Sequence, residues 1–149
     1  MNINKKDVIK EEIYRELVNK VSIDAIKLDS LSITDVNHYN SNNIPQLGVN
    51  LKFENEEFKV NGSELRVLPN FFVEVVDESS ENKEIAFKIN LTFLIEYSIE
   101  GLDKFDNGYV EMFVLRNVPI NIWPYAREFI SSLTTRIGYP ALVIGAYKG

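Results

Sequence analysis

Few side chains in this chain of 149 residues could carry out chemistry. The sequence contains no cysteine, which excludes a disulfide framework, a thiolate zinc site and a cysteine nucleophile. His38 is the only histidine, and it lies in a polar segment without a second histidine that could share a metal ion. An exposed loop histidine is the favoured interpretation, although a triad of His38 with Asp35 or Asp24 and a serine stays open.

Carboxylates that could bind a metal ion gather in two short segments. They are Glu54, Glu56, Glu57, Asp77, Glu78 and Glu81. They lack the alternating spacing of a calcium-binding loop, so solvated charged turns are the favoured interpretation. The sequence also lacks a phosphate-binding glycine loop, a nucleophile elbow and a zinc-protease motif. We expect no catalytic residue, no bound metal and no cofactor, and therefore a protein that is not an enzyme.

The balance of charge argues against nucleic acid as a partner. The chain carries 16 basic and 22 acidic residues, a formal net charge of −6, and no basic cluster. A nucleic-acid groove needs a positive stripe that displaces counterions from phosphates. The N-terminus has no apolar leader, and the most apolar stretch, residues 85–99, contains Lys88, Asn90 and Glu96. We expect a cytoplasmic protein that does not insert into a membrane.

Hydrophobic periodicity predicts helices and antiparallel strands in a single domain. The elements predicted before residue 100 are a helix over 4–20 and strands over 21–36, 47–60, 65–76 and 85–99. The first strand changes its apolar parity twice, which indicates two β-bulges, and acidic residues interrupt the second. Pro69 places part of the third strand at an edge or a bulge. The last strand alternates without a miss, as an antiparallel strand with one buried face does.

A second helix is predicted over residues 121–137. Asn121 can cap its start, Pro124 falls in its first turn, where a missing N–H costs little, and Gly138 suits a left-handed cap at its end. The preceding segment, residues 109–118, is compatible with a short helix or a strand. An antiparallel meander followed by a helix favours an α+β fold over a βαβ fold.

Aromatic residues are more numerous than one thin sheet and two helices need for a core. The set comprises Phe71, Phe72, Phe113, Trp123, Tyr125, Phe129, Tyr139 and Tyr147. Each one alone is best interpreted as a core residue. As a set, they could leave an apolar surface for partner subunits or clients.

The predicted second helix carries a specific motif. Residues 121–133 read Asn-Ile-Trp-Pro-Tyr-Ala-Arg-Glu-Phe-Ile-Ser-Ser-Leu, and Gly138, Tyr139 and Pro140 follow. This segment resembles the signature of the SecB family of protein-export chaperones. The resemblance implies an α+β fold in which a four-stranded antiparallel sheet carries a long C-terminal helix on one face, here with an extra N-terminal helix. It also implies a homotetramer, a dimer of dimers with the long helices at the tetramer interface.

The resemblance further implies an ATP-independent holdase, which binds unfolded or nascent polypeptides and keeps them competent for translocation or folding. The alternative is a SecB-like dedicated chaperone or interaction module for one partner, such as an antitoxin. Residues expected at a client-binding surface or a subunit interface are Trp123, Pro124, Tyr125, Arg127, Glu128, Phe129, Tyr139, Leu142 and Ile144.

The sequence departs from the family pattern at both ends. The helix over 4–20 is an addition to the usual short N-terminus, and Ala146, Lys148 and Gly149 stand where the family has Pro and Asn-Phe. The second helix and the basic, zinc-binding tail through which other members dock on the SecA motor do not follow. SecA is therefore left open as a partner, and one SecB-like domain over residues 1–149 is expected.

Overall fold

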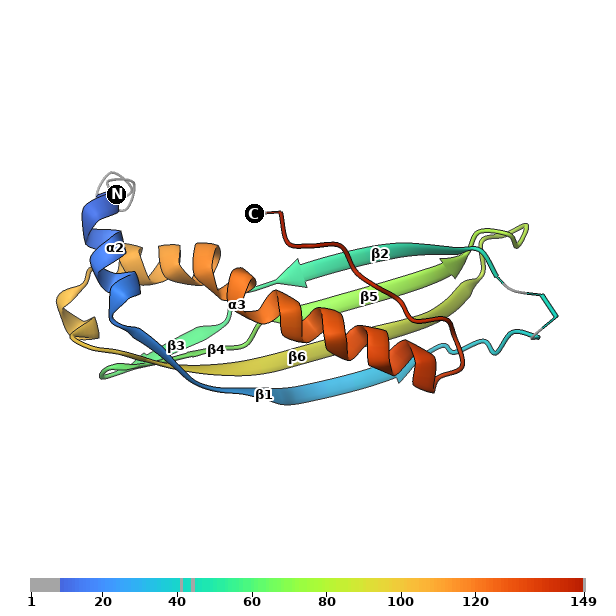
Figure 1. Cartoon of the computed structure of the whole chain (residues 1–149), viewed down its shortest axis with the longest axis horizontal. Helices are drawn as coiled ribbons and strands as arrows, with labels where there is room; N and C mark the ends of the chain where they lie inside the picture. The colour runs from blue at the N-terminus through green and yellow to red at the C-terminus, as the bar shows by residue number, and fades with distance from the viewer. Residues whose placement is uncertain (1–8, 41, 44, 149) are drawn as a thin grey trace.

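A computed structural model describes residues 9–40, 42–43 and 45–148. Figure 1 shows an elongated antiparallel sheet, with the long helix α3 (Asn107–Arg136) across one face and the short helix α2 (Glu11–Asn19) at one end. The predicted N-terminal helix is confirmed from Glu11 onward, and Ile9 and Lys10 precede it. The rest of that prediction, residues 4–8, lies outside the described residues.

The sheet has six strands, where four were predicted. They are β1 (Val21–Thr34), β2 (Leu47–Glu54), β3 (Phe58–Asn61), β4 (Glu64–Val67), β5 (Asn70–Asp77) and β6 (Ile85–Ile99). β1 pairs with nearly the whole length of β6, while β5 and β4 pair with the two halves of β6 on its other side. β2 pairs with β5, and β3 pairs with β4. The six strands therefore form four rows, two of which are interrupted.

A different local feature accompanies each interruption. Pro69 has no N–H to donate, so the ladder breaks between β4 and β5, although the Pro69 carbonyl still accepts a bond from the Phe93 N–H at 3.0 Å. Between β2 and β3, the Asn55 side chain donates through Nδ2 to the Val114 carbonyl of α3 at 2.5 Å. Pairing resumes after each break, and each break therefore divides one predicted strand region into two strands. The predicted α+β class is confirmed, with two more strands than predicted.

The long strands β1 and β6 define the core face of the sheet. Alternate residues of β6 are buried on the face that α3 covers, as the alternation predicted. The register of β1 shifts between Ile23 and Ala25 and again between Leu28 and Ser30, which confirms the two predicted bulges. These shifts keep the valine, leucine and isoleucine residues of β1 opposite buried residues of β6 along the whole strand.

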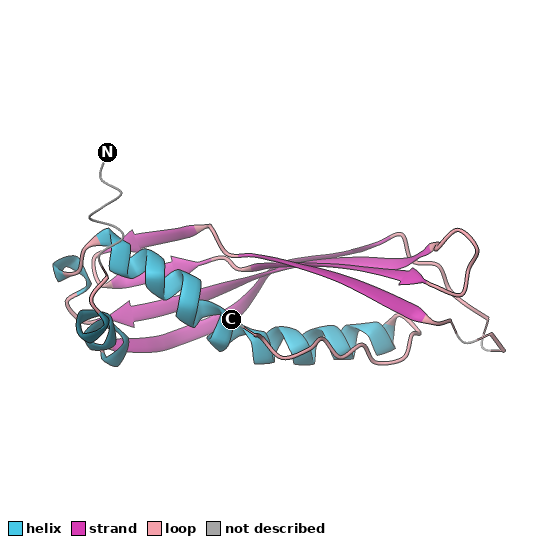
Figure 2. Ribbon diagram, turned by 90° about the horizontal axis from the view of Figure 1, so that it is seen from above, coloured by secondary structure: helices cyan, strands magenta, loops and turns pink. Residues whose placement is uncertain are grey.

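α3 is one helix of 30 residues, which corrects the predicted C-terminal elements. Residues 109–118 belong to this helix and form neither a strand nor a separate helix. Asn121 lies inside it, and its Oδ1 accepts a hydrogen bond from the Tyr97 hydroxyl of β6 at 2.8 Å instead of capping a helix start. Pro119 and Pro124 are both interior, where each removes one backbone hydrogen bond, and α3 changes direction in this region (Figure 2).

The chain leaves α3 through Gly138, whose φ of 92° is the left-handed conformation predicted for it. The tail, residues 138–148, then turns back along the helix (Figure 1). Tyr139 anchors this turn: its hydroxyl donates to the Asn37 carbonyl, and its ring lies 4.9 Å from that of Phe87 and 5.0 Å from that of Tyr39. The tail and the connection from β1 to β2 are thereby tied to the same end of the sheet.

Candidate functional site

An aromatic cluster joins the second half of α3 to the sheet. The Trp123 ring lies 5.2 Å from that of Phe71 on β5 and 5.5 Å from that of Phe53 on β2. Phe71 continues the cluster to Phe93 on β6 at 6.2 Å, and the Phe129 ring of α3 lies 6.1 Å from that of Phe93. Tilted and edge-on ring pairs are favourable beyond the area that they bury. The cluster therefore holds the helix over three rows of the sheet.

Two hydrogen bonds hold the tail on α3, and each joins a side chain of the helix to the backbone of the tail. The Leu142 N–H donates to Thr134 Oγ1 at 2.9 Å. The Trp123 Nε1–H donates to the Gly145 carbonyl at 2.7 Å. Since Leu142 meets the later helix residue and Gly145 the earlier one, the tail runs antiparallel to α3.

A groove of about 540 Å³ opens between the outward side of α3 and the tail. Its lining residues are Ile120, Trp123, Pro124, Arg127, Glu128, Ser131, Val143, Ala146 and Tyr147. Among the described residues, neither Arg127 nor Glu128 forms an ion pair. Their charges are therefore available to a molecule that enters a groove whose other walls are mostly apolar.

The groove continues toward the start of α3. A neighbouring depression of about 610 Å³ is lined by Leu115, Arg116, Ile120 and Tyr147, and it shares the last two with the groove. Leu115 and Ile120 are 65% and 59% exposed, and Tyr125 on the same helix is 54% exposed. The outward side of α3 thus presents large apolar side chains that nothing in the described chain covers.

The sheet face under α3 stays apolar beyond the helix on both sides. We call Ile23, Leu28 and Leu31 the β1 margin, and Val49, Phe58 and Val60 the β2–β3 margin. Each margin residue pairs directly with a buried residue of the adjacent strand, so its side chain shares the helix-covered face. Nevertheless, these side chains are between 37% and 47% exposed.

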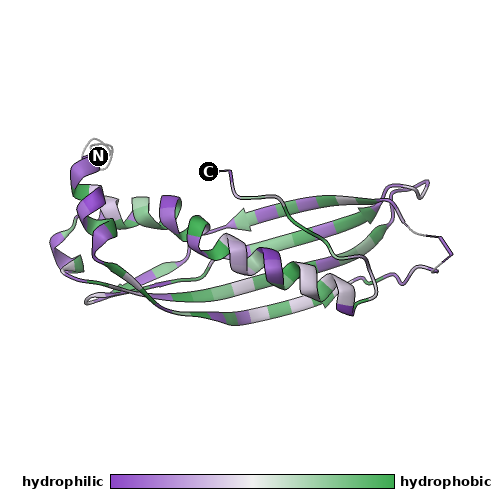
Figure 3. Cartoon of the chain, in the orientation of Figure 1, coloured by the Kyte–Doolittle hydropathy of each residue, from purple (hydrophilic) through white to green (hydrophobic). Residues whose placement is uncertain are grey.

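The exposure of both margins follows from the width of the layers. A helix with its side chains is about 10 Å wide, whereas four rows at a spacing of about 4.8 Å span roughly 14 Å between the outer backbones alone. One helix therefore covers the central rows and leaves the outer rows partly open. Figure 3 shows apolar segments along the edge strands beside α3.

The opposite face of the sheet is polar. Glu96 of β6 pairs with Lys27 at 2.9 Å and with Arg66 at 3.0 Å. The hydrogen bond from Lys27, with the charges of Lys27 and Arg66, holds the pKa of Glu96 below its usual range. Lys88 similarly lies 3.9 Å from Glu74. The ion pairs of the described strands thus lie on this face, although the partly exposed Phe72 and Leu94 interrupt its polar surface.

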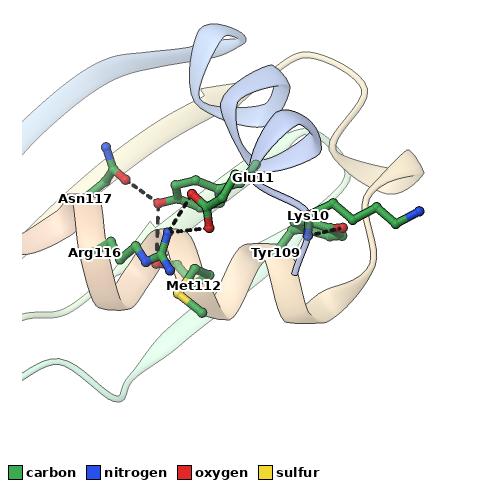
Figure 4. A network of polar contacts seen from close by, with 7 residues as sticks. Lys10, Glu11, Tyr109, Met112, Arg116 and Asn117 are labelled. Atoms are coloured by element: carbon green, nitrogen blue, oxygen red, sulfur yellow. Dashed lines mark hydrogen bonds and ion pairs between the residues drawn. The ribbon is translucent and has the colours of Figure 1, made fainter. Parts of the chain in front are cut away.

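A polar network docks α2 on the first half of α3 (Figure 4). The buried Tyr14 donates its hydroxyl to Asn117 Oδ1, and the Arg116 guanidinium lies 5.2 Å from the centre of the Tyr14 ring. Arg116 also pairs with Glu11 at 3.2 Å. Burial raises the pKa of Tyr14 to about 12, against the opposing charge of Arg116. Such a short helix is marginal alone, so this network and the fully buried Leu17 hold it in place.

The residues expected at a client surface or an interface fall into three groups. Those that line the groove are Trp123, Pro124, Arg127 and Glu128. Tyr125 is exposed on α3 but does not line the groove. Those that lie largely inside the chain are Phe129 and Leu142, which are partly buried against the core, and Tyr139 and Ile144, which are buried.

The sequence reasoning missed several residues that the structure brings to the same surface. They are Leu115, Ile120 and Val143, together with both margins of the sheet. No local pattern marks them, because the exposure of each side chain depends on what the folded chain places beside it.

Little in the described chain points to catalysis. His38 is exposed beyond the end of β1, whereas Asp24 lies near its start and accepts a hydrogen bond from Ser98, so the triad with Asp24 is not assembled. Residues 9–148, apart from 41 and 44, hold no group of three or more His, Asp or Glu residues that could bind a metal ion. No helix in the same residues is long and apolar enough to cross a membrane.

Comparisons with known proteins agree with this arrangement. The SecB-like chaperone Rv1957 of Mycobacterium tuberculosis, solved with a ChAD peptide from the HigA1 antitoxin, aligns at a TM-score of 0.78. It is 16% identical, and the alignment covers 93% of this chain and 98% of that one, which confirms the SecB-like fold. A Streptococcus agalactiae protein of unknown function aligns at a TM-score of only 0.37, with 11% identity over 84% of this chain and 96% of that one.

The sequence itself gives one decisive match. A search of curated protein sequences found nothing similar. The family model described as preprotein translocase subunit SecB, however, matches residues 13–146, which include β1 to β6, α3 and most of the tail. The chain therefore belongs to the SecB family.

Proposed function

We propose that this protein is an ATP-independent holdase, which binds unfolded or nascent polypeptides and keeps them competent for folding or translocation. Membership of the SecB family, whose members are chaperones and not enzymes, supports this function. The observation that carries it in this chain is the apolar sheet face on which α3 leaves both margins exposed. Apolar strips of this kind are typical of surfaces that bind other polypeptides.

The β1 margin suits an extended client. β1 has 14 residues, so it runs for about 46 Å at ~3.3 Å per residue. An unfolded chain laid along it would place apolar side chains against Ile23, Leu28 and Leu31. Each contact is weak because each margin side chain is already half-buried, so affinity comes from several contacts made at once. A folded protein hides its apolar residues and would gain little.

The groove beside the tail is the second proposed client surface. Its apolar walls include Trp123 and Pro124, while Arg127 and Glu128 could pair with charged groups that flank an apolar client segment. Phe129, Tyr139, Leu142 and Ile144 would support this surface from inside the chain, because they are partly or wholly buried.

We also propose how the chain assembles. One SecB-like domain over residues 1–149 would form a cytoplasmic homotetramer, a dimer of dimers. Leu115 and Ile120, which are exposed and line one depression on α3, support a subunit interface there, because a second copy of the helix would cover them.

A narrower function is the alternative: a chaperone or interaction module dedicated to one partner, such as an antitoxin. The observation in its favour is the fold shared with a SecB-like chaperone that was solved with an antitoxin peptide. A dedicated chaperone would bind one segment far more tightly than unrelated unfolded chains, whereas a general holdase would bind many segments with similar affinity.

A binding experiment separates the two functions. Fluorescence anisotropy would report the affinity of the full-length protein for two unrelated client proteins. Each client is tested in a permanently unfolded form and in its native form. A general holdase binds both unfolded chains and neither native form. Failure to bind any unfolded chain would reject it and favour a dedicated partner. Preference for a native protein would instead indicate an interaction module.

A further inference from the structure

The tail is seated on α3 as an extended peptide would be. Residues 140–148 adopt neither helix nor strand. Ile144 is 4% exposed, whereas the preceding Val143 is 58% exposed, so side chains point alternately inward and outward. Leu142 packs against the core on the inward side, and the Tyr147 ring lies 5.1 Å from that of Trp123. The tail thus fills an apolar surface in the manner of an unfolded segment.

The two hydrogen bonds that hold the tail on α3 are made to the backbone of the tail and not to its side chains. Trp123 binds the Gly145 carbonyl, and Thr134 binds the Leu142 N–H. Trp123 and Thr134 are eleven residues apart, about 16 Å at the helical rise of ~1.5 Å. The four tail residues from Leu142 to Gly145 span about 13 Å when extended, at ~3.3 Å each, which is close to the distance along the helix. The backbone of any extended segment could therefore form the same two hydrogen bonds.

The side chains that the tail packs against α3 indicate which peptide segments could bind in its place. Leu142 and Ile144 place two aliphatic groups at alternate positions, and Tyr147 places an aromatic ring three residues later against Trp123. Outward positions such as Val143 impose no such demand. The required pattern is an aliphatic residue, any residue, a second aliphatic residue, two further residues and an aromatic residue.

We infer that the surface of α3 between Trp123 and Thr134 is a peptide-binding site for this pattern, which the tail occupies in the absence of a client. This inference rests on the proposed chaperone function and adds to it the chemistry of a preferred client segment. A client of this pattern binds by displacing the tail, and its backbone takes over the bonds to Trp123 and Thr134.

The tail lowers the apparent affinity of this site for clients. A segment on a short tether has an effective concentration of about 1 mM. Suppose that the tail and a free peptide bind the site equally well, with an intrinsic Kd below ~0.1 mM. Competition from the tail then raises the apparent Kd of the free peptide at least about tenfold. Loosening the tail should therefore tighten the binding of a free peptide by at least that factor.

The test uses full-length protein and a fluorescent peptide with the sequence of residues 139–148. Ile144→Asp replaces a buried aliphatic group of the tail with a charge, and we expect it to bind the peptide at least tenfold more tightly than the wild type. Ala141→Asp is the matched control, because Ala141 is exposed and the added charge is the same. It should bind the peptide as the wild type does.

Two outcomes decide the inference. If Ile144→Asp is folded by circular dichroism and binds the peptide no more tightly than the wild type, the inference is wrong and the tail is only structural. If Ile144→Asp fails to fold, Ile144→Ala takes its place, with tightening still expected and its absence again overturning the inference.

The proposed function is tested separately in the same preparations, by suppression of the aggregation of an unfolded protein. Suppression by the wild type without tightening of peptide binding in the variant rejects the inference alone. Tightening without suppression by either protein supports the peptide site and rejects the holdase function.

Discussion

Charged substitutions in the β1 margin should weaken client binding by an amount that the structure sets. Leu28 and Leu31 are 47% and 38% exposed, so a client can bury about that share of each side chain. Full burial of a leucine contributes about 1.5–3 kcal/mol, which gives about 1.3–2.5 kcal/mol for the two exposed shares together. At about 1.4 kcal/mol per factor of ten, Leu28→Asp with Leu31→Asp should raise Kd roughly ten- to sixtyfold. Burial of the new carboxylates would add to this loss.

The matched control places the same charges on the other face of the same strand. Ser30 and Ser32 are exposed and pair with Thr92 and Asn90, so Ser30→Asp with Ser32→Asp changes the net charge equally without touching the margin. Fluorescence anisotropy with a labelled, permanently unfolded protein gives Kd for each folded variant. Equal weakening in both variants would indicate a charge effect alone. Unchanged affinity in the Leu28 and Leu31 variant would refute the margin as a client surface.

Three further predictions concern the fold. Tyr14→Phe removes the hydroxyl that donates to Asn117 and should lower the free energy of unfolding by about 1 kcal/mol in urea denaturation. Alkaline pH should destabilise the protein, because burial raises the pKa of Tyr14 to about 12 and also raises that of Tyr97. Above pH ~10, the usual tyrosine pKa, these tyrosines ionise in the unfolded chain before they ionise in the folded one, so the free energy of unfolding falls as pH rises. Phe71→Ala should cost about 3–5 kcal/mol, because Phe71 is fully buried in the aromatic cluster, and the only tryptophan, Trp123, gives a fluorescence signal for it.

Each of these predictions has a contradicting result. Unchanged stability of Tyr14→Phe would show that the hydroxyl contributes nothing to the docking of α2. A free energy of unfolding that stays level between pH 9 and 12 would contradict the burial of the tyrosine hydroxyls. A loss below ~1.5 kcal/mol for Phe71→Ala, with unchanged Trp123 emission, would mean that the cluster is loosely packed.

The sheet could be predicted from the sequence because its pattern has a local cause. One face of β6 is buried and the other is not, so apolar and polar residues alternate along its whole length. The two changes of parity in β1 predicted its bulges for the same reason, since each extra residue moves the following side chains to the other face.

The continuity of α3 could not be predicted, because it depends on contacts made far along the chain. Two interior prolines normally end or kink a helix, and each of them removes a hydrogen bond. Tertiary packing offsets this cost: Val118 and Ile122 are fully buried on either side of Pro119, and Asn121 binds the Tyr97 hydroxyl of β6. None of these partners is visible in the local sequence.

The candidate site was predicted in part. The motif pointed to the segment around Trp123, which does line the groove. The margins were missed because exposure of an apolar strand residue depends on how far a neighbouring helix reaches across the sheet. Leu142 and Ile144 were expected at a client surface or an interface, but their packing against the core could not be predicted, because only the folded chain shows what they cover.

The proposed chaperone activity is tested most directly by light scattering. A chemically unfolded protein that aggregates on dilution is mixed with increasing amounts of this protein, without nucleotide. We expect scattering to fall in proportion to the amount added and to vanish near a fixed molar ratio, with no further effect of ATP. Undiminished scattering in the presence of a folded, oligomeric protein would contradict a general holdase.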